Sequence, residues 1–132
     1  MVHIPPMLWR KIADRYNLTG SHCQNCKSDY FPQRKFCPKC RRKGKIIQKK
    51  MPSHGKIVSW TKVFAAPMGF EMETPYYLAI IELGNGVRLM SQIVDSKEEK
   101  VKSGATVQLA FRRVGEGEEE GLISYGFKFK IA

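Results

Sequence analysis

The chain has 132 residues, 42% of them hydrophobic and 27% charged, which is the ordinary balance of a soluble globular protein. Its longest apolar runs, such as residues 76–81, are too short for a membrane-spanning helix, and no signal segment is recognisable, so we expect a cytoplasmic protein without a membrane partner. The formal net charge of +11 lies entirely in residues 1–50, because residues 51–132 hold ten basic and ten acidic side chains. This concentration favours an anionic partner: nucleic acid, an acidic protein surface or a phosphorylated cofactor. The alternative is that the cations only offset nearby negative charge and keep the protein soluble.

The first predicted element is a helix over about residues 6–18. Proline at the start of a helix costs little, since the amide that it lacks would be unpaired in the first turn. Leu8, Ile12 and Tyr16 recur every four residues and therefore share one face, while Gly20 is a stop signal. We expect this face to pack on the rest of the protein, or to form one wall of an anion-binding groove or a protein interface.

The four cysteines form two CxxC pairs separated by ten residues, Cys23 with Cys26 and Cys37 with Cys40. Two intervening residues let both thiolates of a pair turn back onto one ion, and the longer excursion lets the second pair fold against the first. The pattern predicts a tetrahedral Zn²⁺ site that is closed to water and therefore structural. Iron with the same ligands stays open, because spacing does not choose the metal. Disulfides would need an oxidising compartment, and a redox CxxC would need a thioredoxin-like context that the sequence does not show.

Residues 21–45 make up the predicted ribbon proper. Tyr30 and Phe31 lie between the cysteine pairs, where aromatic side chains usually cover the metal site. His22 precedes the first cysteine, and we expect it to be solvated, with a contact to a metal ligand as the alternative. A strand can start at residues 46–47, and residues 49–52 are interpreted as a connector.

The second half of the chain is typical of β-structure. Gly84-Asn85-Gly86 is a strong hairpin signal, and residues 95–104 predict a short helix or turn with Asp95 or Ser96 as N-cap. Residues 115–121 are expected to form a mobile acidic loop. Five strands with one helical insertion match the layout of an OB-fold barrel, with another small sandwich as the alternative. The predicted strands cover residues 56–64, 76–83, 87–94, 106–114 and 122–131.

The predicted fold is therefore mainly β with an N-terminal helix. We divide it into a helical segment over residues 1–20, a zinc ribbon over residues 21–50 and an OB-fold over residues 51–132. The sequence also resembles a known family, the archaeal and bacterial proteins with a rubredoxin-like zinc ribbon and an OB-fold, long named domain of unknown function thirty-five. The resemblance covers nearly the whole chain. It rests on the doubled CxxC with Phe31-Pro32 between the pairs, on GKIVSWT at residues 55–61 and on PYYLAIIELGNG at residues 75–86.

The resemblance implies an accessory protein and not an enzyme, because members of this family accompany thiolase-superfamily enzymes of the acetoacetyl-CoA thiolase and hydroxymethylglutaryl-CoA synthase type. It implies a non-catalytic scaffold that contributes to a shared acyl-CoA site. A basic helix and ribbon joined to an apolar barrel would suit the phosphate end and the acyl-pantetheine arm of CoA. The candidates for the phosphate end are basic residues of the first half: Arg10, Lys11, Arg34, Lys35 and Arg41.

Candidates for the acyl-pantetheine arm or a partner surface are Trp60, Phe64, Met68 and Phe70. Trp60 and Phe64 are predicted to share a strand face, so we expect core positions for both before ligand contacts. Met68 and Phe70, with Met72, lie in a predicted loop, where exposed apolar groups favour recognition.

The sequence also bears on two other function classes. Zinc ribbons and OB-folds both bind single-stranded nucleic acid through basic grooves and stacking aromatics, but the neutral charge balance of residues 51–132 counts against this alternative. Catalysis by the chain itself is not expected. The three histidines lie outside the predicted barrel strands, and the sequence contains no paired acidic motif, phosphate-binding glycine loop or HExxH pattern.

Overall fold

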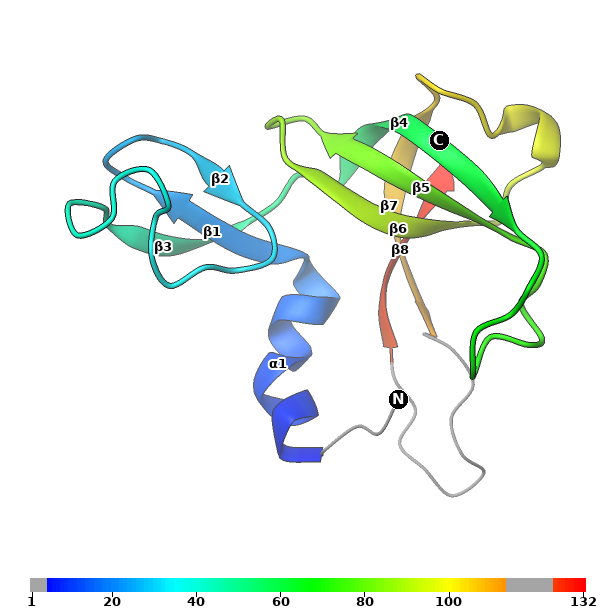
Figure 1. The fold of residues 1–132 in the computed structure, drawn as a ribbon, viewed down its shortest axis with the longest axis horizontal. Coiled ribbons are helices and arrows are strands. Elements are labelled where there is room, and N and C mark those ends of the chain that lie inside the picture. The colour runs from blue at the N-terminus through cyan, green and yellow to red at the C-terminus, as the bar shows by residue number, and fades with distance from the viewer. Residues whose placement is uncertain (1–4, 114–124) are drawn as a thin grey trace.

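The computed structural model describes residues 5–113 and 125–132, which form one α-helix, a three-stranded sheet and a closed five-stranded barrel. Figure 1 shows the small sheet beside the barrel, with the helix below the small sheet in this view. The predicted fold class is confirmed: mainly β, with a zinc ribbon followed by an OB-fold. In this described part of the chain, no helix is long and apolar enough to cross a membrane.

Helix α1 spans Pro5–Asn17, in agreement with the periodicity. The predicted stop signal was wrong, because Leu18 turns the chain with a φ of 49° and Gly20 lies inside the first strand. Leu18 buries its whole side chain at this turn, so it ends the helix and contributes to the core at once. The ring of Tyr16 packs edge-on against Phe111 of the barrel, with 4.9 Å between ring centroids, which fixes the helix against the second domain.

The ribbon contains a sheet of three antiparallel strands in the order β2-β1-β3. The strands are β1 (Thr19–Cys23), β2 (Asp29–Tyr30) and β3 (Ile46–Lys50). The predicted connector therefore starts too early, since Lys49 and Lys50 pair with Gly20 and Thr19. Their side chains are exposed, so the ladder partner and not burial makes them strand residues.

The barrel strands pair in the closed order β4-β5-β6-β8-β7, with β4 and β7 completing the circle. All neighbours are antiparallel except β6 and β8, which are parallel and pair only at Ile93↔Phe129 and Val94↔Lys130. The hairpin predicted at residues 84–86 joins β5 to β6, and Gly86 supplies the positive φ of 84°. The strands are β4 (His54–Val63), β5 (Tyr76–Leu83), β6 (Arg88–Val94), β7 (Thr106–Arg113) and β8 (Tyr125–Ile131).

Three details differ from the sequence expectations. β4 begins at His54, which places one histidine inside a barrel strand. The insertion after β6 is a single 3₁₀ turn, η1 (Glu98–Lys100), whose N-cap position is Lys97 and not Asp95 or Ser96. The expected acidic loop at residues 115–121, and the predicted start of the last strand, lie outside the described residues.

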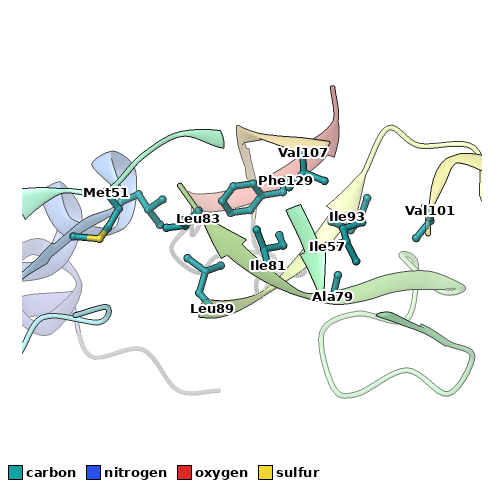
Figure 2. Close-up of a cluster of buried hydrophobic side chains, with 11 residues drawn as sticks. Met51, Ile57, Ala79, Ile81, Leu83, Leu89, Ile93, Val101, Val107 and Phe129 are labelled. Atoms are coloured by element: carbon teal, nitrogen blue, oxygen red, sulfur yellow. The ribbon is translucent and has the colours of Figure 1, made fainter. Parts of the chain in front are cut away.

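The hydrophobic core sits inside the barrel and reaches the base of the ribbon (Figure 2). Ile57, Ile81 and Phe129 are almost fully buried, as alternation along the strands requires for one inward face. Leu18 and Met51, which flank the ribbon sheet, belong to the same cluster, and the amide of Met51 donates to the carbonyl of Leu18 at 3.0 Å. The ribbon is therefore rooted in the barrel core.

Phe31 provides a second link between the two domains. We expected it to cover the metal site, but its ring packs edge-on against Phe127 of β8, with 5.5 Å between centroids. Phe31 and Phe127 are both partly buried against the core cluster. In the segment between the cysteine pairs, Tyr30 therefore contacts the ribbon, at the Cys37 sulfur, and the next residue, Phe31, contacts the barrel.

Candidate metal centre and surrounding surface

The four cysteines meet at one point of the ribbon. Their sulfur atoms all lie within 4.8 Å of one another, close to the edge of about 3.8 Å that a tetrahedron of Zn–S bonds of about 2.3 Å requires. The cluster contains four soft thiolate donors, which suit zinc, and a full set of four leaves no position for water. The residues therefore fit a structural zinc ion with ligands Cys23, Cys26, Cys37 and Cys40.

Two similar turns aim the cysteine pairs at this point. Lys27 and Arg41 each follow the second cysteine of a pair, and both adopt the left-handed backbone conformation, with φ of 56° and 51°. Gly44 lies against the second turn, where a Cβ atom would come within 2.8 Å of the Cys37 Cβ. A side chain at position 44 would therefore push on the metal ligands, which the cysteine spacing alone did not reveal.

Polar neighbours adjust the thiols before any metal binds. The Tyr30 hydroxyl lies 3.5 Å from the Cys37 sulfur, and its hydrogen bond lowers the pKa of Cys37 to about 6 because it stabilises the thiolate. The Asn25 amide donates to Cys40 and by itself lowers that pKa, but burial and the neighbouring cysteines outweigh it and raise the pKa of Cys40 to about 11. A bound divalent cation would favour deprotonation of Cys40 despite this raised pKa, since its charge neutralises the adjacent thiolates.

Beside the metal centre, Asp29 joins the ribbon to the barrel. Its carboxylate contacts His22 Nδ1 at 2.5 Å and accepts hydrogen bonds from Lys49 Nζ at 3.0 Å and Asn85 Nδ2 at 2.7 Å. Burial alone would raise the pKa of Asp29, but these three partners lower it below its ordinary value. We call this group the Asp29 cluster. His22 is thus not simply solvated, as we had expected from the sequence.

The cations predicted to bind phosphate lie on the helix and the ribbon. Gln33 Nε2 donates to Asp14 Oδ1 at 2.8 Å, which ties the loop that carries Arg34 and Lys35 to α1. Arg10 is exposed one helical turn before Asp14. Arg41 lies instead in the turn after the last cysteine, and the side chain of Lys11 is outside the described residues. The structure therefore links three of the five candidates through neighbouring elements.

The expectation that Trp60 and Phe64 are core residues was wrong. Trp60 is 41% exposed and contacts the ring of Tyr77 edge-on, while Phe64 lies just beyond β4 and is 73% exposed. Met68 and Met72 are still more accessible, at 85% and 83%. Together, residues 64–75 form a loop that presents large apolar side chains to solvent. We call this segment the apolar loop.

The apolar loop is held in shape by its own polar groups. The amides of Phe70 and Glu73 donate to the carbonyls of Pro67 and Phe70, each at 3.0 Å. The Phe70 ring packs on Tyr76 at 6.0 Å between centroids, and Glu73 forms an ion pair with Lys128 of β8 at 3.3 Å. Its backbone is therefore anchored to the barrel while its methionines project outward.

Several residues of this surface carry no recognisable sequence signal. Asn25 and Asp29 act through contacts with Cys40 and Asn85, which lie 15 and 56 residues away, and Gly44 acts through its close approach to Cys37, so cysteine spacing could not identify them. Asn85 was identified only as a turn residue, although its side chain also joins the two domains. Such roles depend on tertiary contacts.

Comparison with known proteins gives a consistent result. A family model described as the ChsH2 rubredoxin-like zinc ribbon domain matches residues 10–45, and one described as the ChsH2 C-terminal OB-fold domain matches residues 48–112. A DUF35 domain-containing scaffold protein of Methanocaldococcus jannaschii is 48% identical over 92% of this chain and 86% of that protein. A protein of the same description in Methanothermobacter thermautotrophicus is 47% identical over 92% of both chains.

Among solved structures, one titled Ltp2-ChsH2(DUF35) aldolase matches 99% of this chain and 96% of that chain, with a TM-score of 0.70 and 22% sequence identity. At this identity the likeness supports the fold. The likeness in fold extends over nearly the whole of both chains, although most of the residues differ.

Proposed function

Because this chain belongs to the DUF35 family of zinc-ribbon and OB-fold proteins, we propose that it is a non-catalytic scaffold for an enzyme of the thiolase superfamily, of the acetoacetyl-CoA thiolase or hydroxymethylglutaryl-CoA synthase type. Relatives nearly half identical to it over almost their whole length are described as scaffold proteins. The closed donor set of the metal centre agrees with this role, since four cysteine ligands leave no position at which a substrate could bind the ion.

The apolar loop is the part of this chain that best supports the proposal, because it is suited to contact a partner enzyme. Phe64, Met68 and Met72 expose most of their side chains on a segment whose backbone is fixed by hydrogen bonds. Exposed apolar groups on an ordered loop mark a recognition surface, because little conformational entropy is lost when they bind. We assign this loop to an apolar depression on the partner enzyme. Methionine side chains adapt to such depressions because they are flexible and polarisable.

The basic surface of α1 and the ribbon supports the second part of the proposal, an acyl-CoA held between scaffold and enzyme. Arg34 and Lys35 lie on the loop that Gln33 ties to the helix, and Arg10 is exposed on that helix. Guanidinium groups bind phosphate in a bidentate manner and suit the nucleotide end of CoA. Lys11 and Arg41 remain candidates for the same end, and Trp60 and Phe70 for the acyl-pantetheine arm.

Capture from native extract tests the scaffold role. Tagged protein should recover a thiolase-superfamily enzyme identified by mass spectrometry, and a Phe64→Ser, Met68→Ser, Met72→Ser variant should lose it. Met90→Ser is the matched control, because Met90 is 65% exposed on β6, outside the apolar loop. Recovery of ribosomal or replication proteins without a thiolase would contradict the proposal and favour nucleic-acid binding.

Calorimetry tests the CoA part separately. We expect CoA to bind the scaffold–enzyme complex more tightly than either protein alone, and Arg34→Gln with Lys35→Gln to weaken binding by about tenfold, the loss expected for one charged hydrogen bond. Lys56→Gln, at an exposed position on β4, is the control for simple loss of charge. Equal affinity in the double variant would remove these residues from the phosphate site.

A further inference from the structure

The segment around the second cysteine pair has a surface made almost entirely of cations. We call residues 34–45 the basic knuckle. Every exposed side chain in it is a lysine or an arginine except Phe36 and Pro38. The chain has no acidic residue between Asp29 and Glu71, so none lies near the knuckle in sequence. The seven exposed cations are Arg34, Lys35, Lys39, Arg41, Arg42, Lys43 and Lys45.

These cations exceed what the metal centre needs to balance its charge. Four thiolates with one Zn²⁺ carry a net charge of −2, which leaves a surplus of +5 on the basic knuckle. Within residues 5–113 and 125–132, no carboxylate forms an ion pair with any of the seven. The surplus is therefore available to an anionic partner.

The backbone of the basic knuckle is held in place. The amide of Arg41 donates to the carbonyl of Cys37 at 2.9 Å, which closes the turn. Ser21 Oγ of β1 accepts a hydrogen bond from the Arg34 amide at 2.7 Å and donates one to the Arg34 carbonyl at 3.1 Å. The Arg34 guanidinium also lies over the Tyr30 ring, 5.5 Å from its centroid. Less conformational entropy is lost when a partner binds groups on a fixed backbone.

Phe36 distinguishes between the kinds of anionic partner. Its side chain is 77% exposed, and the exposed side chains around it in the chain are cations. The core of a protein interface is depleted of charged residues, so an aromatic ring among cations is poorly suited to anchor an acidic protein. Sites for single-stranded nucleic acid combine cations along the phosphate backbone with aromatic rings on which bases stack.

A duplex fits the basic knuckle less well than a single strand. The bases of a duplex stack on one another, so their faces cannot reach Phe36. Residues 34–45 form turns and bends and no helix that could enter a major groove. The neutral charge balance of residues 51–132 argues against strand binding by the barrel, but the basic knuckle lies outside it.

We propose that the basic knuckle binds single-stranded nucleic acid. Its cations contact successive phosphates, and a base stacks on the ring of Phe36. This activity does not depend on the scaffold role, but it shares three cations with the CoA site proposed above: Arg34, Lys35 and Arg41. A strand and CoA would therefore compete, whereas Phe36 belongs to the strand site alone.

Fluorescence anisotropy of the full zinc-bound chain with labelled oligo-uridine and oligo-deoxythymidine tests the site. A length of about 16 nucleotides covers the site sizes of single-strand-binding modules. We expect saturable binding of at least one strand, with an affinity that falls with salt by a logarithmic slope of about 0.7 per phosphate contact. Replacing Arg41, Arg42 and Lys43 together by Gln should lower that slope by about 2, because three contacts are lost.

Phe36→Ala tests the stacking contact. It should weaken strand binding about tenfold, the loss expected for one stacked base, and leave the salt slope unchanged because no charge is removed. Phe64→Ala is the matched aromatic control, since Phe64 is 73% exposed on the apolar loop and should not affect strand binding. Phe36→Ala should leave CoA binding unchanged, so failure of either proposal can be recognised separately.

Replacing Lys97, Lys100 and Lys102 together by Gln is the charge-matched control, because all three are exposed beside the barrel. This variant should keep the parent's affinity and salt slope. The proposal is overturned if neither strand binds, or if a duplex of the same length binds as tightly. Equal affinity for poly-glutamate would also overturn it and assign the basic knuckle to an acidic protein. So would an unchanged affinity in Phe36→Ala, or an equal loss in the barrel and knuckle lysine and arginine variants.

Discussion

The ribbon and the barrel are stabilised by different means. In the ribbon, β1, β2 and β3 total twelve residues, and the turns at Lys27 and Arg41 follow the second cysteine of each pair of the metal cluster. In the barrel, eight of the eleven buried apolar residues of the core cluster lie on the five strands. A small segment that lacks apolar area for its own core needs a metal, whereas a closed barrel buries one face of every strand.

This contrast also separates stability from recognition. The excess positive charge lies with the metal-stabilised half, and the exposed apolar loop lies on the barrel. The half that a metal stabilises thus offers charged side chains to partners, and the barrel, which an apolar core stabilises, offers an apolar loop. The Asp29 cluster and the shared residues Leu18 and Met51 keep the two surfaces in fixed relation.

Removing the metal should produce the largest effect, and it should be confined to the ribbon. Cys37→Ser deletes a buried ligand whose thiolate is favoured at neutral pH, and metal binding in small zinc sites contributes on the order of 10 kcal/mol to folding. We expect loss of bound zinc and loss of hydrogen-exchange protection in β1–β3. A variant that keeps its full zinc content by elemental analysis would refute the four-cysteine assignment.

Truncating a side chain of the barrel core should destabilise the barrel and leave the metal centre of the ribbon intact. Ile81 is fully buried, so Ile81→Ala should lower the free energy of unfolding of the barrel by about 2–5 kcal/mol in urea titrations, with zinc content unchanged. The adjacent Ile80 points outward and is 41% exposed. Ile80→Ala is therefore the matched control, expected within about 0.5 kcal/mol of the parent. Equal losses at both positions would mean that the inward and outward faces are wrongly assigned.

Weakening the Asp29 cluster should loosen the link between the domains without unfolding either one. Asp29→Asn removes a charge that three side chains contact, and we expect a loss of about 2 kcal/mol from the hydrogen bonds to that charge. Because the pKa of Asp29 in the folded protein is below its ordinary 3.8, the stabilisation is fully present above pH 3.8 and is lost as pH falls through the lower value.

The pH series provides the control for this prediction. The difference in free energy of unfolding between the parent and Asp29→Asn should be constant near neutral pH. It should fall toward zero as the pH falls below the pKa of Asp29. Asn85→Ala, which removes the barrel's donor to Asp29, should reproduce part of the loss. A difference that persists unchanged below the pKa of the carboxyl group would mean that its charge is not what joins the domains.

The smallest effect is expected at an exposed ion pair on the barrel. Arg88 and Glu82 lie on paired strands, 3.1 Å apart, with side chains 62% and 41% exposed. Solvent screens such pairs, so Arg88→Gln should change the free energy of unfolding by less than about 1 kcal/mol. A larger loss in thermal unfolding would show that surface charge contributes to the barrel as well as to the ribbon.

The sequence by itself determined the features that depend on local pattern. The doubled CxxC placed the metal ligands, because two-residue spacing forces both thiolates toward one ion. Alternating apolar residues and the Gly-Asn-Gly turn placed β5 and β6 nearly to the residue, because strand period and turn chemistry are local. The helix followed from its periodicity.

Tertiary structure decided which of these residues meet. Phe31 packs against Phe127 of the barrel and does not cover the metal site, because it makes an aromatic contact that no local sequence pattern encodes. Phe64 lies at the surface because β4 ends at Val63 and leaves it on the apolar loop, whereas Trp60, inside β4, contacts Tyr77 and is still 41% exposed. Asp29 with Asn85, and Lys128 with Glu73, lie more than fifty residues apart in the chain. The first pair meets because the ribbon packs on the barrel, and the second because the apolar loop packs on β8. Sequence spacing specifies neither contact.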